Sequence, residues 1–235
     1  MLQIRSSTAA IAALLVLSLG GAAQAQAAKA AYPSMAPIAQ YRVASQAEEV
    51  ALARSAAPPS ISNDAEVLTL GDRGYETAAK GKNGFVCIVE RAWASDFEDA
   101  EFWNPKLRAP ICFNPASVRS VLPTYLKRTE WILAGASKAE MIERTKAAIA
   151  AKEIAAPEVG AMCYMMSKGG YLSDAAGGHW HPHLMFFLPR SEAAAWGANL
   201  PGSPVMGGGG GIDPATVFFA LVPNWSDGTP AAMGM

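Results

Sequence analysis

The chain has 235 residues, with 19 Lys and Arg against 20 Asp and Glu, and charged residues make up 17% of it. This near-neutral balance excludes the electrostatic footprint of a nucleic-acid-binding protein. Beyond the N-terminal region no segment approaches the 18 consecutive apolar residues of a membrane-spanning helix, so we expect the mature chain to be water-soluble. The length suffices for one sizeable hydrophobic core.

The first 27 residues have the organisation of an export signal. Arg5 gives a short positive start, an apolar stretch covers residues 11–19, and Ala23-Gln24-Ala25 and Ala25-Gln26-Ala27 both fit a small-x-small cleavage site. A membrane anchor is the alternative, but the apolar stretch is short for a bilayer. We therefore expect a cleaved signal peptide over residues 1–27, and a periplasmic or secreted protein with no stable membrane insertion afterwards.

Two further regions follow the signal. Residues 28–44 are rich in Ala, Pro and Gln, which is typical of a flexible leader. Residues 45–235 alternate between strand-like and helix-like patterns without an internal repeat, and we expect them to form a single globular domain.

The first half of this domain is expected to contain one helix and several strands. Ser45 and Glu48 have capping-box spacing, so a helix should run to about Arg54. Asn83-Gly84 is typical of a tight hairpin turn. The expected strands are 66–70, then 75–80 and 85–93 as the two arms of that hairpin, and then 108–113.

The second half is expected to contain helices and then more strands. One helix should begin after Asn114 and be kinked or split by Pro123, and the next begins with a capping box at Ser137 and Glu140. Strands are expected over 160–167, 181–189 and 215–225. The predicted fold class is α+β, a single domain with a mainly antiparallel sheet and two to three helices packed on one side.

The chain has three cysteines, and an exported protein can keep a disulfide. Three pairings of Cys87, Cys112 and Cys163 are possible, and the sequence does not choose among them. A bond between Cys87 and Cys112 would close a loop of about 26 residues, worth about 3–4 kcal/mol in the chain-entropy model.

All three histidines lie within five residues, in GGHWHPHLMFF at 177–187. In a β-strand, side chains alternate between faces, so His179, His181, His183 and Met185 would share one face. Trp180, Pro182, Leu184 and Phe186 would share the other, which suits a hydrophobic core. The sequence thus predicts a row of nitrogen and sulfur donors, with His181 and His183 as the first metal-binding pair and His179 as a third ligand or an outer group.

Other donors extend this candidate site. Met162, Cys163, Met165 and Met166 lie in another expected strand, where Cys163 and Met165 would share a face. If that strand pairs with the histidine strand, a His/Cys/Met site becomes possible, which favours copper over zinc. Ordinary core packing is the alternative for the methionines. Asp174 is a candidate ligand, a partner for an imidazole, or a turn residue.

Residues 177–183 are similar to the H-x-H with which the cupins, all-β jelly rolls, begin their metal site. The similarity is confined to this short span, because no Glu lies four residues beyond His183 and residues 115–153 are helical in pattern. The sequence therefore assigns the chain to no family.

Three functions remain open. The first is non-catalytic handling or sensing of a transition metal, copper or zinc, by an exported protein. The second is an exported metal-dependent hydrolase or oxygenase, with Asp174 or a carboxylate of the 96–101 loop as base. The third is a globular interaction domain in which the histidine face binds no metal.

Overall fold

The computed structural model describes residues 32–174, 178, 180–207 and 212–231. The expected signal peptide, residues 1–27, lies outside them. In the described part, eight strands form one sheet in the order β2-β1-β3-β4-β5-β6-β8-β7, and all neighbours are antiparallel except β1 and β3. The strands are β1 (Glu66–Leu70), β2 (Tyr75–Ala79), β3 (Val86–Glu90), β4 (Ala109–Phe113), β5 (Met162–Met165), β6 (His183–Pro189), β7 (Val205–Gly207) and β8 (Ala215–Leu221).

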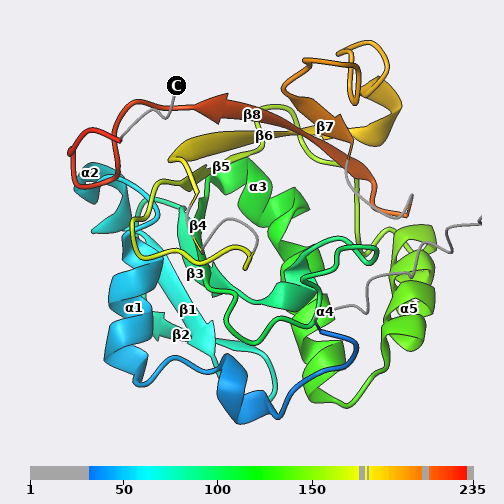
Figure 1. The fold of residues 1–235 in the computed structure, drawn as a ribbon, viewed down its shortest axis with the longest axis horizontal. Coiled ribbons are helices and arrows are strands. Elements are labelled where there is room, and N and C mark those ends of the chain that lie inside the picture. Colours follow the sequence, from blue (N-terminus) through cyan, green and yellow to red (C-terminus); the bar gives the residue numbers. More distant parts are fainter. Residues whose placement is uncertain (1–31, 175–177, 179, 208–211, 232–235) are drawn as a thin grey trace, which may run out of the picture.

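Helices lie on both faces of the sheet (Figure 1). The expected α+β class with a mainly antiparallel sheet agrees with this arrangement, but the expectation of two to three helices on one side was wrong. Five α-helices are described because proline breaks divide the helical segments and a short turn follows Pro58. They are α1 (Gln46–Arg54), α2 (Pro59–Ser62), α3 (Pro115–Ser120), α4 (Leu122–Leu133) and α5 (Lys138–Ala150). The short 3-10 helices η1 (Ile38–Tyr41), η2 (Ala92–Ala94) and η3 (Arg190–Glu192) lie before α1, between β3 and β4, and between β6 and β7.

The two faces have separate cores. On one face α1 packs over the centre of the sheet, where Ala53, Val67 and Val89 are fully buried. On the other, α3 and α4 cover a larger core that extends from Ile88 to Phe187. Because β3 and β4 are covered on both sides, every residue in them is buried, which fits the apolar residues at 86–89.

The hairpin expected at Asn83-Gly84 is absent from the sheet, because β2 and β3 are not neighbours. β2 instead forms a hairpin with β1, and β3 lies on the other side of β1 in parallel. The Asn83 side chain donates to the Ile61 carbonyl at 2.7 Å and accepts from Phe85 N–H at 3.0 Å. The first contact ties the turn to α2, and Lys82 N–H donates to the Asp64 carbonyl in the α2–β1 connection. The turn therefore serves a crossover and not a two-residue hairpin.

The flexible leader expected over residues 28–44 also differs from what its described part, from residue 32 on, shows. This segment packs on the body, with Tyr41 fully buried in the larger core. The Tyr41 hydroxyl donates to the Trp103 carbonyl at 2.8 Å. The buried Tyr41 ring, whose hydroxyl has a hydrogen-bond partner, holds this segment against the body. The composition of the segment alone had suggested that it would be mobile.

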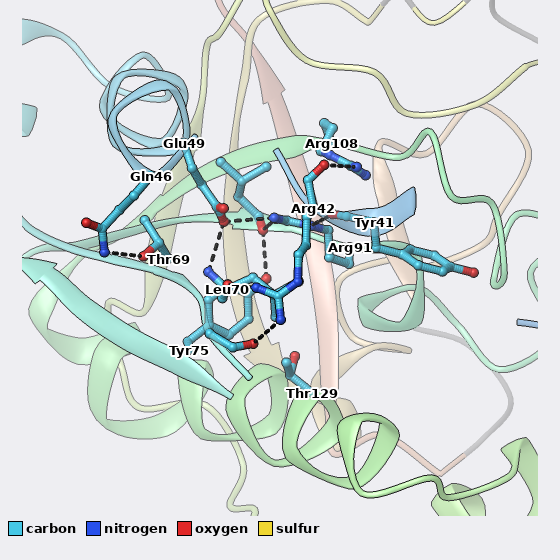
Figure 2. Close-up of polar contacts among 12 residues, drawn as sticks. Tyr41, Arg42, Gln46, Glu49, Thr69, Leu70, Tyr75, Arg91, Arg108 and Thr129 are labelled. Atoms are coloured by element: carbon cyan, nitrogen blue, oxygen red, sulfur yellow. Dashed lines mark hydrogen bonds and ion pairs between the residues drawn. The ribbon is translucent and has the colours of Figure 1, made fainter. Parts of the chain in front are cut away.

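A buried ion pair joins α1 to the end of β3 (Figure 2). Arg91 is fully buried, and its guanidinium donates to Glu49 at 2.8 Å and to the Tyr41 carbonyl at 2.6 Å. It also donates to the Val89 carbonyl. The same Glu49 oxygen accepts from Leu70 N–H at 3.1 Å. One carboxylate and one guanidinium therefore connect a helix, two strands and the N-terminal segment.

The disulfide joins Cys87 and Cys112, which lie directly opposite each other on β3 and β4. Cys163 is a buried free thiol. This resolves the three pairings that the sequence left open, and it is compatible with an oxidising compartment. No helix in the described part of the chain is both long enough and apolar enough to cross a lipid bilayer.

We expect Glu49→Ala to lower the free energy of unfolding by about 3–5 kcal/mol, because it leaves the Arg91 charge buried without its partner. Urea denaturation at neutral pH measures this. The matched control is Glu48→Ala, which removes an exposed carboxylate from the neighbouring position in the first turn of α1 and should cost at most about 1 kcal/mol. Equal effects of the two substitutions would contradict the role assigned to the pair.

We expect the Cys87→Ala/Cys112→Ala variant to lose about 3–4 kcal/mol of stability, from the loop that the bond closes. Mass spectrometry after alkylation in denaturant, without reductant, gives an independent measure. One alkyl group, on Cys163, is expected in the wild-type protein, and three would show that the bond does not form.

Candidate metal centre

The strand that contains Cys163 pairs with the strand that contains His183. In the antiparallel register of β5 and β6, Met165 lies opposite His183, and Cys163 lies opposite Met185. All four are buried, with exposed fractions of 4% for Met165, 7% for His183, 0% for Cys163 and 8% for Met185. Alternation along each strand places the four side chains on one face. The Cys163 strand thus pairs with the His183 strand, which is what a His/Cys/Met site requires.

This face is the core face, contrary to the sequence expectation. His183, Met185 and Phe187 are buried, whereas Leu184 and Phe186 are half-buried. The reason is the layer of α3 and α4, which covers the Met185 side of the sheet, while α1 lies over β1, β3 and β4 on the other side.

The strand begins at His183, two residues later than expected. His181 precedes it, with an exposed side chain, so the described residues do not continue the alternation to His181. Trp180 and Pro182 instead anchor the approach to the strand, because the Trp180 indole donates to the Ser167 carbonyl and the Pro182 carbonyl accepts from Val222 N–H. His179 lies outside the described residues.

The His183 ring has a defined orientation. Its Nδ1 lies 2.7 Å from the His181 carbonyl oxygen. Because a carbonyl only accepts, Nδ1 carries the proton and Nε2 keeps its lone pair. Burial lowers the pKa of His183, which favours the neutral ring. Trp180, with ring centroids 5.7 Å apart, and Phe219, at 5.3 Å, pack against it.

Asp174 is engaged elsewhere. Its carboxylate accepts hydrogen bonds from Tyr171 and Tyr32 and from the Lys106 ammonium group at 3.1 Å. These donors lower the pKa of Asp174 to about 2, with the Tyr171 bond as the largest cause. Its described hydrogen bonds therefore go to two phenols and an amine, and none goes to a described imidazole.

Glu90, at the end of β3, is a buried polar residue that the sequence reasoning missed. It is 8% exposed, and its Oε1 has no hydrogen-bond partner among the described residues. Burial raises the pKa of Glu90 to about 8, which a hydrogen bond from Tyr125 partly opposes. The sequence feature that could have indicated it is a glutamate at the end of an otherwise apolar central strand.

Glu90 also links two other buried groups electrostatically. Burial, and then the Glu90 charge, raise the pKa of the Cys163 thiol and of the Tyr125 hydroxyl well above their usual values. Cys163 is therefore a neutral thiol at physiological pH.

The described residues contain no group of three or more His, Cys, Asp and Glu side chains placed to hold a metal ion. A centre on this face would therefore use methionine sulfur together with His183. No family model, curated protein or solved structure matches the chain.

We expect Glu90→Gln to change how stability depends on pH. A carboxyl whose pKa is higher in the folded than in the unfolded state makes the folded protein less stable as pH rises from about 4.5 to about 8. The free energy of unfolding then falls by at most about 1.4 kcal/mol per pH unit. Removing the Glu90 carboxyl should make this fall smaller and should stabilise the protein near pH 8. The facing groups Tyr125, Cys163 and Tyr75 stay neutral in this range, because burial raises their pKa values.

Urea denaturation from pH 5 to pH 9 measures the effect. Glu130→Gln, at an exposed position on α4, is the control and should keep the wild-type pH profile. Parallel profiles for the wild type and Glu90→Gln would show that Glu90 does not titrate in this range.

Proposed function

We propose that the protein is exported and binds one copper ion, in the copper(I) state, without catalysing a reaction. The observation that carries the proposal is the β5–β6 register, which sets Met165 opposite His183 and Cys163 opposite Met185 on one buried face. Directly opposite side chains in an antiparallel pair have Cβ atoms about 4.5–5.5 Å apart, and same-face neighbours along a strand are about 6.7 Å apart. Flexible thioether side chains can converge on one ion over such a patch.

The chemistry of the donors favours copper(I) over zinc. Thioether sulfur is a soft ligand that selects copper(I), whereas zinc prefers thiolate, imidazole and carboxylate. Imidazole and two thioethers bring no charge into the core. A monovalent ion is therefore less costly to bury there than a divalent one.

The His183 contacts support its role as the nitrogen ligand. A metal-binding imidazole generally donates its other N–H to a carbonyl or carboxylate, which fixes the ring and its tautomer. The Nδ1 bond to the His181 carbonyl does this and leaves Nε2 for the ion. The exposed His181 imidazole would offer a first contact at the surface.

We expect the wild-type protein to take up about one copper(I) ion in a competition titration with a chromophoric copper(I) chelator. Met165→Leu/Met185→Leu should weaken binding at least about tenfold, which corresponds to 1.4 kcal/mol, because it removes both thioethers while conserving volume. The matched control is Met141→Leu, the same change at a buried position on α5, and it should leave the affinity unchanged.

A second variant tests the imidazoles. His181→Ala/His183→Ala should abolish copper uptake. Circular dichroism should first confirm that this variant folds, and the leucine variants carry the test if it does not. Copper uptake by the leucine double variant equal to that of the wild type would rule out the proposed centre.

A further inference from the structure

A hollow lies between α4 and the β6–β8 end of the sheet, apart from the proposed copper ligands. Its volume is about 110 Å³. The walls are mostly apolar, and Val121, Phe187 and Val217 come from the helix layer and two neighbouring strands. An apolar cavity of about 150 Å³ accepts benzene, so this smaller hollow can take at most a single small ring.

The polar side of the hollow is an ion pair held in a fixed position. The Arg128 guanidinium is 2% exposed and donates to Asp213 at 2.6 Å. It also donates to the carbonyls of Ala94 and Ser95 at 3.3 and 3.2 Å, and it lies 4.3 Å from the centre of the Phe97 ring. These contacts fix the guanidinium and therefore the carboxylate that it binds.

The charges of this pair decide what the hollow can bind. Arg128 compensates Asp213, so the lining has no net charge to offer to an ion, and a charged ligand would lose its hydration without a counter-charge. The Asp213 side chain is 19% exposed, and one of its oxygens is taken by Arg128, which leaves the other as an acceptor. Thr124 contributes a hydroxyl to the same lining.

We propose that this hollow binds a small neutral molecule with one apolar ring and one hydroxyl group. The ring would occupy the space beside Phe187 and Val217. The hydroxyl would donate to Asp213 and accept from Thr124. This site is independent of copper binding, since it includes none of the proposed ligands.

Isothermal titration calorimetry with phenol and with cyclohexanol tests the proposal, and benzoate serves as the charged analogue. We expect saturable binding of both alcohols, and at least tenfold weaker binding of benzoate. Thr124→Val should weaken alcohol binding about fivefold, the value of one hydrogen bond of about 1 kcal/mol.

Two tryptophan substitutions separate binding in the hollow from binding elsewhere. Ala155 is exposed and lines the hollow, whereas its neighbour Ala156 is exposed and does not line it. Ala155→Trp should block the hollow and weaken phenol binding at least tenfold, and Ala156→Trp should leave it unchanged. No saturable binding by the wild type, equal affinities in both tryptophan variants, or tighter binding of benzoate than of phenol would overturn the proposal.

Discussion

The constraint on which the centre of the molecule depends is the buried charge of Arg91. A guanidinium cannot lose its proton, so in the core it must be compensated and hydrogen-bonded on several sides. Glu49 and the carbonyls of Tyr41 and Val89 provide these contacts. Each lies in a different segment, and the geometry of Arg91 therefore fixes where α1, η1 and β3 stand relative to one another.

This constraint extends along the sheet. α1 packs on the β3–β4 pair, which the Cys87–Cys112 disulfide also joins, so the helix and the bond restrict the same two strands. β4 then sets the register of β5, and β5 sets that of β6. The positions of the side chains on the β5–β6 face are therefore fixed through the strand register. A binding site needs side chains that are held in place in this way by regular secondary structure.

The sequence predicted the features that local interactions decide. The Ser45 and Ser137 side chains cap α1 and α5 as expected, because an N-cap bond spans only three residues. Pro123 marks the break between α3 and α4. The order of the strands depended instead on distant contacts, such as the bond from Asn83 to Ile61, and no pattern within the 75–93 segment contains that information.

In the candidate site, too, the sequence predicted what local interactions decide and missed what distant contacts decide. Alternation correctly grouped His183 with Met185 and Cys163 with Met165, since each pair lies within one strand. It did not determine which face of β6 is buried, because that face is covered by α3 and α4, which end well before β6 in the chain. Glu90 was missed because its burial depends on Tyr125 and the helix layer, although a glutamate beside an apolar run was visible.

The burial of the donor face gives the methionines two possible roles, and His183 distinguishes them. Methionine fills irregular cores well, so Met165 and Met185 alone would call for no further explanation. An imidazole is a poor core residue, because each ring nitrogen that leaves water needs a partner. The His181 carbonyl accepts from Nδ1 and leaves Nε2 as the nitrogen that could bind an ion. His183 shares its face of the sheet with Met165 and Met185, and leucine or phenylalanine at residue 183 would not complete such a ligand set.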